Sequence, residues 1–182
     1  DVEYIFGDHI ASISGDGDVT FAHAAGRRFD VVIGADGLHS GVRQLVFGNQ
    51  RRYDTHWGGW VWWAPAEVCP ADTFVEMWGA ARFVGLYPTT RGVGVFAGAP
   101  IEDGFESPDG RRARLTRKFA GMGERCERVL ASLPDDGTEM FFWHLSDVRA
   151  DEWVHHRVVL LGDAAAGFLP TAGIGASMAM ES

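Results

Sequence analysis

The chain has 182 residues, of which 46% are hydrophobic and 23% charged, and its formal net charge at pH 7 is -9. These proportions are typical of a folded globular protein, and the negative charge argues against nucleic acid or an anionic membrane surface as a partner. The two cysteines lie far apart without companion histidines, so we expect neither a metal site nor a disulfide framework. No signal peptide or membrane span is recognisable, and we expect a cytoplasmic protein that binds a small, neutral or weakly charged molecule.

The first fifty residues alternate between short apolar stretches and glycine-containing turns. Residues 10–13, 19–23 and 29–33 have the pattern of strands, and we expect them to form a small antiparallel meander. A short helix is predicted over residues 40–46, with Ser40 placed to cap its first turn.

The middle of the chain is dense in aromatic and β-branched residues that Gly and Pro interrupt, which is typical of strands. Four strands of one sheet are predicted there, at residues 56–63, 73–78, 82–87 and 92–97. Residues 111–133 have helical spacing and are predicted to form two helices that part near residues 121–123. Strands follow at residues 139–145 and 158–161, the second a buried apolar run of the parallel kind. The predicted fold class is therefore mixed α/β, with a mainly antiparallel sheet flanked by helices.

The strongest motif follows the predicted strand at residues 158–161. It consists of Gly162 and Asp163, then Pro170, Gly173 and Gly175, and a helix that begins near Ala176. A carboxylate at the end of a buried strand can accept a hydrogen bond from a ribityl or ribose hydroxyl. The two later glycines let the backbone pass close to a flat ring, and the amide groups at the start of the helix favour negative charge on that ring.

A related motif lies upstream, after the predicted strand at residues 29–33. It contains Gly34, Ala35, Asp36 and Gly37, and then Ser40, Val42 and Arg43 at the start of a helix. Asp36 and nearby backbone amides could meet the sugar and pyrophosphate of a nucleotide. The alternative interpretation of either motif is an ordinary strand, turn and capped helix, with Arg43 in a surface ion pair.

Together the two motifs resemble those of the FAD-dependent monooxygenases of the aromatic-hydroxylase type, known as group A flavoprotein monooxygenases. The upstream motif matches the family's GADG segment at every defining position, and the family places it against the FAD pyrophosphate and implicates it with the nicotinamide nucleotide. The downstream motif is similar to the family's GDAAH segment and the Pro, Gly and Gly that follow it. Ala166 stands where the family usually has His, and Ser182 stands where it usually has Asp. By this resemblance Asp36, Gly37, Arg43, Gly162, Asp163, Pro170, Gly173, Gly175 and Ala176 are predicted to bind FAD.

The family's opening Gly-x-Gly-x-x-Gly segment has no counterpart in the sequence, so we expect the chain to be an internal part of such an enzyme. The resemblance implies a partial FAD-binding region over residues 1–50, a substrate-binding sheet with helices over residues 51–150, and a second FAD-binding region over residues 151–182. On alternating strands Trp60 and Trp62 should share one face of the sheet, while Val61 and Trp63 share the other. Trp60, Trp62, Trp78 and Tyr87 are the residues that we expect to contact a flat aromatic or apolar substrate.

The resemblance implies an enzyme that binds FAD, takes hydride from NADH or NADPH, and uses oxygen to hydroxylate an aromatic or unsaturated small molecule. Basic charge comes almost wholly from arginine, which is typical of a GC-rich bacterial genome. The cofactor supplies the chemistry, so no catalytic acid or base is assigned. Two alternatives stay open. One is a flavin-dependent reductase or halogenase relative, for which Lys118, the single lysine, is a poor catalytic candidate. The other is a non-catalytic binding domain, since the chain by itself is expected to be inactive.

Overall fold

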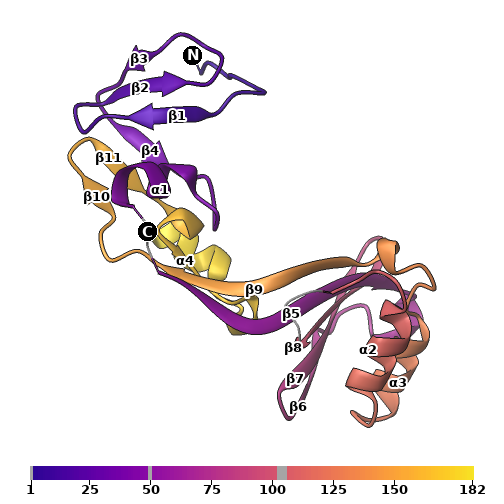
Figure 1. The fold of residues 1–182 in the computed structure, drawn as a ribbon. Helices are drawn as coiled ribbons and strands as arrows, with labels where there is room; N and C mark the ends of the chain where they lie inside the picture. The colour runs from indigo at the N-terminus through magenta and orange to yellow at the C-terminus, as the bar shows by residue number, and fades with distance from the viewer. Residues whose placement is uncertain (1, 49–50, 102–105) are drawn as a thin grey trace. The chain divides into compact units, whose positions relative to one another are not determined.

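The computed structural model describes residues 2–48, 51–101 and 106–182, and the chain divides into two compact units (Figure 1). The first unit combines Asp1–Tyr53 with Ser146–Ser182, and the second is the continuous segment Asp54–Leu145. The mixed α/β class expected from the sequence is confirmed. None of the helices that the structure describes is long and apolar enough to cross a bilayer.

The first unit contains two three-stranded sheets. One is antiparallel, with β1 (Ile10–Ile13), β2 (Asp18–Phe21) and β3 (Arg27–Arg28) in that order. The other has the order β10 (Val154–His155), β11 (Val158–Leu160) and β4 (Val32–Gly34). Helix α1 (Gly41–Phe47) packs on β4 and β11, and its apolar residues join the second core of the chain. That core consists of Val19, Val32, Val42, Val158, Leu160 and Ala165.

One strand of the predicted meander belongs elsewhere. Residues 29–33 were expected to pair antiparallel with residues 19–23, but Arg27–Arg28 is the strand that pairs with β2. Val32–Gly34 instead runs parallel to Val158–Leu160, with Val32 opposite Val158 and Gly34 opposite Leu160. The physical reason is burial, because Val32 and its partner strand are apolar and are enclosed in the core, whereas β3 is exposed on both faces.

The second unit is built on an antiparallel sheet with the strand order β9-β5-β8-β7-β6. These strands are β5 (Arg52–Ala64), β6 (Val75–Gly79), β7 (Arg82–Thr89), β8 (Gly92–Pro100) and β9 (Phe141–Arg149), and the chain passes from one unit to the other within β5 and again near the middle of β9. The four predicted strands are confirmed, as are the two predicted helices, α2 (Arg111–Phe119) and α3 (Glu124–Ala131). Both helices lie on one face of this sheet (Figure 1).

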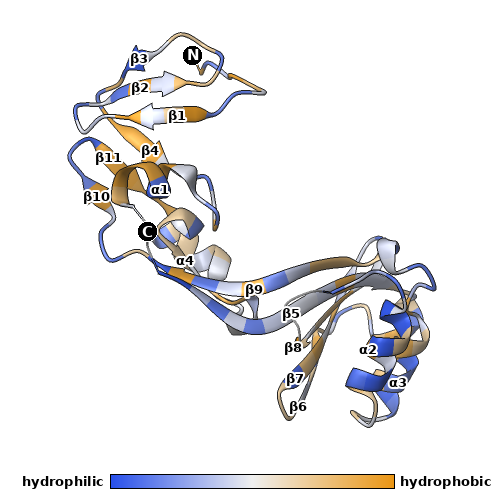
Figure 2. Cartoon of the chain, viewed as in Figure 1, coloured by the Kyte–Doolittle hydropathy of each residue, from blue (hydrophilic) through white to orange (hydrophobic). Residues whose placement is uncertain are grey.

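The main core lies between α2, α3 and that face of the sheet. Trp60, Trp62, Val84 and Leu86 contribute from the strands, and Leu115, Phe119, Val129 and Leu130 from the helices. The outward surfaces of α2 and α3 are hydrophilic, whereas β7 and β8 carry mainly apolar residues (Figure 2). The amphipathic helices therefore bury their apolar sides on one face of the strands, and neither α2 nor α3 covers the opposite face of the sheet.

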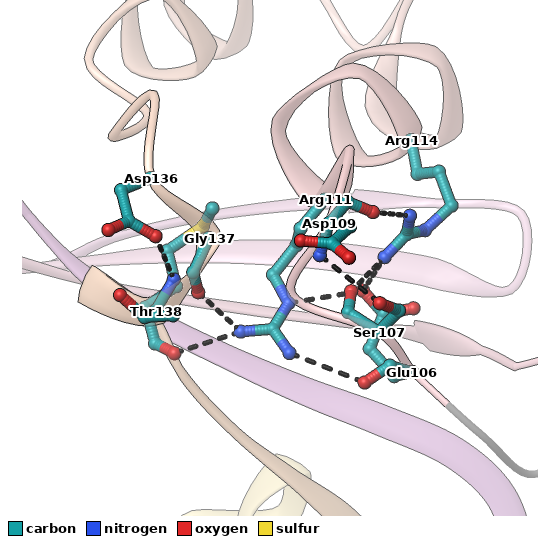
Figure 3. Close-up of polar contacts among 9 residues, drawn as sticks. Glu106, Ser107, Asp109, Arg111, Arg114, Asp136, Gly137 and Thr138 are labelled. Atoms are coloured by element: carbon teal, nitrogen blue, oxygen red, sulfur yellow. Dashed lines mark hydrogen bonds and ion pairs between the residues drawn. The ribbon is translucent and has the colours of Figure 1, made fainter.

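A buried arginine joins the start of α2 to the segment before β9 (Figure 3). The Arg111 side chain is 5% exposed and pairs with Glu106 at 3.2 Å, and it donates to the carbonyl oxygens of Gly137 at 2.6 Å and Met140 at 3.0 Å. Its guanidinium also lies 5.6 Å from the ring centre of Phe142 in β9. The same carboxylate accepts from Arg114 at 2.8 Å. Glu106 therefore pairs with two arginines of α2 and holds the segment before this helix against its first turn.

The remaining elements are short. They are the 3-10 turns η1 (Ala66–Val68), η2 (Gly137–Glu139), η3 (Gly162–Ala164) and η4 (Pro170–Ala172), the strand β12 (Ala166–Gly167) and the helix α4 (Gly175–Glu181). Strand β12 pairs antiparallel with β9 at Val148 and Arg149.

Candidate functional site

The two sequence motifs begin at the same edge of one sheet in the first unit. β4 and β11 are adjacent and parallel, and the amide of Leu161 donates to the carbonyl oxygen of Gly34 at 2.9 Å. Parallel strands present their carboxyl ends at one edge, so the segment that starts at Ala35 and the segment that starts at Gly162 leave the sheet side by side. Gly34 is needed here because a Cβ at that position would lie 2.8 Å from Val42 Cγ1 and 2.9 Å from Leu160 Cδ2.

Asp36 and Ser40 shape the loop that opens α1. The Asp36 carboxylate accepts from the hydroxyl of Ser40 and from the amide of Val42 at 3.1 Å. The Ser40 oxygen in turn accepts from the amide of Arg43 at 2.9 Å, which confirms the predicted helix cap. Asp36 is exposed, and Gly37 has a φ of +80°, so the loop presents a carboxylate and a backbone free of a side chain to its surroundings.

Arg43 links the two motifs. It is 8% exposed, and its guanidinium donates to the carbonyl oxygen of Leu38 at 2.7 Å and to that of Ala164 at 2.7 Å. Burial lowers the pKa of Arg43 and Asp36 opposes that effect, while the nearby Arg52 lowers the pKa further. The buried Arg43 side chain thus connects the segment after β4 to the segment after β11 by hydrogen bonds. The alternative of a surface ion pair for this residue is wrong.

A polar pocket with a volume of about 370 Å³ lies beside Arg43. Arg52 lines it and contacts the His39 ring at 3.3 Å, and its Nε donates to the Ser146 hydroxyl at 3.1 Å. None of the described residues that line this pocket is acidic; they are Leu38, His39, Ser40, Arg43, Gln44, Gly48 and Arg52. A pocket that carries two guanidinium groups and no carboxylate is suited to a phosphate group.

Asp163 has the free carboxylate of the site. It is exposed in η3, directly after β11, and no described residue makes a hydrogen bond or ion pair with its side chain. Gly162, which precedes it, has a φ of +59°, a conformation that favours glycine. The amide of Gly162 donates to the hydroxyl of Ser182 at 2.7 Å, and that hydroxyl donates to the carbonyl oxygen of Ala179 at 3.1 Å. Ser182 therefore joins the end of α4 to the Gly-Asp turn, a role that the sequence motif did not reveal.

The backbone around Gly173 and Gly175 faces open space. Pro170 begins the turn η4, Gly173 follows with a φ of +65°, and α4 starts at Gly175, one residue before the predicted Ala176. A Cβ at Gly173 or at Gly175 would meet no atom within 4 Å. Among the described residues no side chain caps α4, so its first amide groups have no side-chain acceptor. With no side chain at Gly173 or Gly175, the backbone of this segment could lie close to the edge of a flat ring.

In the second unit, the side of the sheet opposite α2 and α3 is an aromatic face, which we define by Trp63, Trp78, Phe83, Tyr87, Phe96 and Trp143. Strand pairing puts rings opposite glycines: Phe83 opposite Gly98, Phe96 opposite Gly85 and Tyr87 opposite Gly94. The rings of Phe96 and Trp143 are stacked with centres 5.3 Å apart, and those of Trp78 and Phe83 with centres 5.1 Å apart. A Cβ at Gly59 would lie 2.9 Å from Phe96, so the glycines let the rings lie close to the backbone.

The four predicted substrate residues divide between the two faces of the sheet. Trp78 is 60% exposed and Tyr87 is partly buried, and both belong to the aromatic face. Trp60 and Trp62 are each 1% exposed and lie in the core beneath α2 and α3, where Trp62 Nε1 donates to Ser132. The expected alternation of Trp60 and Trp62 against Trp63 is confirmed, but the helices cover the face of the first two. Their side chains have no surface left for a ligand, which corrects their assignment to substrate.

Comparison with known proteins shows the family of the chain. A family model described as "FAD binding domain" matches residues 28–182. The chain therefore belongs to this family of FAD-dependent flavoproteins, the group A aromatic-hydroxylase type.

Particular relatives lie within the same family. The chain is 33% identical over 186 residues to the FAD-dependent urate hydroxylase of Klebsiella pneumoniae, covering 97% of the chain and 48% of the relative. It is 38% identical over 160 residues to the 3-amino-4-hydroxybenzoate 2-monooxygenase of Streptomyces cremeus, covering 84% and 39%. The crystal structure of Klebsiella pneumoniae HpxO with FAD and uric acid matches with a TM-score of 0.82 at 29% identity, covering 96% and 47%. The chain thus spans about half the length, or less, of the relatives it matches.

Proposed function

We propose that this chain is part of an FAD-dependent monooxygenase that uses NADH or NADPH and oxygen to hydroxylate an aromatic or unsaturated small molecule. The observation that carries the proposal is the convergence of both flavin motifs on one sheet edge, where Arg43 joins them through Ala164. The relatives named above support the reaction class, since their names describe a hydroxylase and a monooxygenase.

The residues present fit FAD. The unpaired carboxylate of Asp163 would accept hydrogen bonds from ribityl or ribose hydroxyls, and the open backbone at Gly173 and Gly175 would lie along the flavin ring. The Gly37 loop and the pocket with Arg52 would receive phosphate groups, from FAD or from the nicotinamide nucleotide. When bound, the flavin supplies hydride acceptance and oxygen activation, which no side chain here could provide.

The second unit would supply the substrate surface. Its aromatic face offers stacked and tilted rings that suit a flat apolar molecule and exclude water from it. In this division the segments 1–53 and 146–182 hold the cofactor and the segment 54–145 holds the substrate. The single lysine, Lys118, lies on α2 and donates to the carbonyl oxygen of Pro100 at 2.7 Å, which gives the halogenase alternative no support.

The visible absorption spectrum of the protein purified from its complete reading frame tests the proposal. Flavin bands near roughly 370 and 450 nm, together with oxidation of NADH or NADPH that aromatic compounds accelerate, are expected of such an enzyme. A product that stays colourless after FAD is added would rule the monooxygenase out and leave a binding domain on a flavoprotein scaffold.

A further inference from the structure

The carboxylate of Glu76 lies beside two rings of the aromatic face. Glu76 is exposed on β6, opposite Gly85 of β7. Its Oε1 accepts from the Tyr87 hydroxyl at 2.9 Å, and its Oε2 accepts from Trp78 Nε1 at 3.2 Å. Both partners are residues of the aromatic face, so the two hydrogen bonds fix the carboxylate against the rings.

The negative charge of Glu76 is not neutralised by its neighbours. Tyr87 and Trp78 are neutral donors, and no ion pair joins Glu76 to any arginine, lysine or histidine that the structure describes. A carboxylate offers about four acceptor positions, so roughly two are left for a ligand. Burial and the hydrogen bond to Glu76 raise the pKa of Tyr87 to about 12, which keeps its hydroxyl protonated as a donor.

No cation balances this charge from the neighbouring strands. The strands β6, β7 and β8 are described throughout, and their charged side chains are Glu76 and Arg82. Arg82 lies on the opposite face, where it donates to the carbonyl oxygen of Lys118 in α2 at 2.6 Å. Among the residues of these three strands, Glu76 is therefore the charged side chain on the aromatic face.

We infer that Glu76 determines which aromatic molecules this face accepts: flat rings with an N–H or O–H donor or a positive charge, and not aromatic carboxylates. The inference rests on the proposed function, because it names the substrate class of that same enzyme. A donor on the ligand would bond to a free lone pair of Glu76 while the ring stacks on Trp78 or Tyr87. An anionic ligand would meet an uncompensated like charge at the same position, which is how a site rejects a competitor of the same shape.

Two naphthalene derivatives of similar size test the inference by isothermal titration calorimetry on the protein from the complete reading frame. We expect naphthylmethylamine to bind at least about tenfold more tightly than naphthoate, since a hydrogen bond to a charged group corresponds to that ratio or more. Glu76→Gln removes the charge and keeps the shape, and it should reduce the ratio to within about threefold. Tyr87→Phe keeps the ring but frees Oε1, so amine binding should be retained or strengthened.

The matched control is Glu67→Gln, which makes the same charge change at an exposed position in η1, at a residue that is not part of the aromatic face. It should leave the amine-to-naphthoate ratio unchanged. An unchanged ratio in Glu76→Gln, a preference for naphthoate in the unaltered protein, or no binding of either compound would each overturn the inference. The flavin spectrum of the same preparations separates the two proposals. If the protein holds FAD but Glu76→Gln does not change the amine-to-naphthoate ratio, the proposed function stands and this inference is wrong.

Discussion

The guanidinium of Arg43 donates a 2.7 Å hydrogen bond to the carbonyl oxygen of Ala164, which is 121 residues further along the chain. The second bond, to the carbonyl oxygen of Leu38, holds the loop that contains Asp36. Through one buried side chain, the positions of the two flavin motifs depend on each other.

Replacing Arg43 with lysine should uncouple these motifs. Lysine can satisfy one of the two buried carbonyl oxygens in this geometry, and an unsatisfied buried acceptor costs about 1–3 kcal/mol. We expect that loss in the free energy of unfolding in urea, with a parallel drop in the fraction of protein that retains FAD. Arg51→Lys, at an exposed position, is the control and should change neither quantity. An unchanged free energy of unfolding in Arg43→Lys would show that the two hydrogen bonds of Arg43 do not stabilise the fold.

Asp163→Asn should weaken FAD binding without harming the fold. The carboxylate is exposed and bonded to no described residue, so its loss leaves the folded chain intact. A hydrogen bond to a charged acceptor contributes about 1.5–3 kcal/mol. Its loss corresponds to a dissociation constant for FAD that is roughly tenfold to hundredfold larger. Quenching of flavin fluorescence during titration of the apoprotein measures it. Asp16→Asn, in an exposed turn of the same unit, should bind FAD normally.

Arg111→Met should destabilise the second unit strongly. The substitution removes one of the two arginines that pair with Glu106, whose side chain is 10% exposed, and leaves the carbonyl oxygens of Gly137 and Met140 without this donor. Breaking a buried pair from one side costs about 3–5 kcal/mol. Urea unfolding followed by tryptophan fluorescence reports the change, because Trp60 and Trp62 lie in the adjoining core. Arg128→Met removes an exposed helix pair with Glu124 and should cost less than about 1 kcal/mol. Equal losses in the two variants would contradict this account.

The Tyr87 hydroxyl should lose its proton only at strongly alkaline pH. Its pKa is raised to about 12 by burial and by the hydrogen bond to Glu76, whereas the ordinary pKa of tyrosine is 10.0. Since the folded state favours the protonated form, the stabilisation is fully present below pH 10 and is lost as the pH rises toward 12. The difference in phenolate absorbance between the unaltered protein and Tyr87→Phe should have its midpoint near pH 12. A midpoint near pH 10 would contradict both the burial of this hydroxyl and its hydrogen bond to Glu76.

Local patterns predicted most elements because their causes are local. The Ser40 cap, the gap between α2 and α3, and the alternation of Trp60, Trp62 and Trp63 depend on neighbours a few residues away. The alternation does not show which face of the sheet is covered, because the covering helices α2 and α3 lie about fifty residues or more later in the chain. It therefore could not assign Trp60 and Trp62 to the core.

The features that sequence patterns missed depend on distant partners. The parallel pairing of β4 with β11 and the bond from Arg43 to Ala164 join residues more than a hundred positions apart. The role of Ser182 depends on the turn at Gly162, and that of Glu76 on a cross-strand tyrosine. The motifs selected residues that the fold brings to one sheet edge, but three-dimensional positions were needed to tell which of them face open space and which support a neighbour.

The interruption of the first unit by the second has a consequence for how the protein is made. β4 leaves the ribosome long before β11, its parallel partner, and at about 5–20 residues per second the 121 residues between Arg43 and Ala164 take roughly 6–24 s to synthesise. During that interval the second unit is a continuous chain and can fold from its own hairpins. Until β11 is made, the edge of β4 that will pair with it is unpaired. Ile33 of β4 is exposed, and an unpaired strand edge can pair with other chains. Ribosome stalling or premature termination before β11 should therefore produce aggregation even where the second unit is already native.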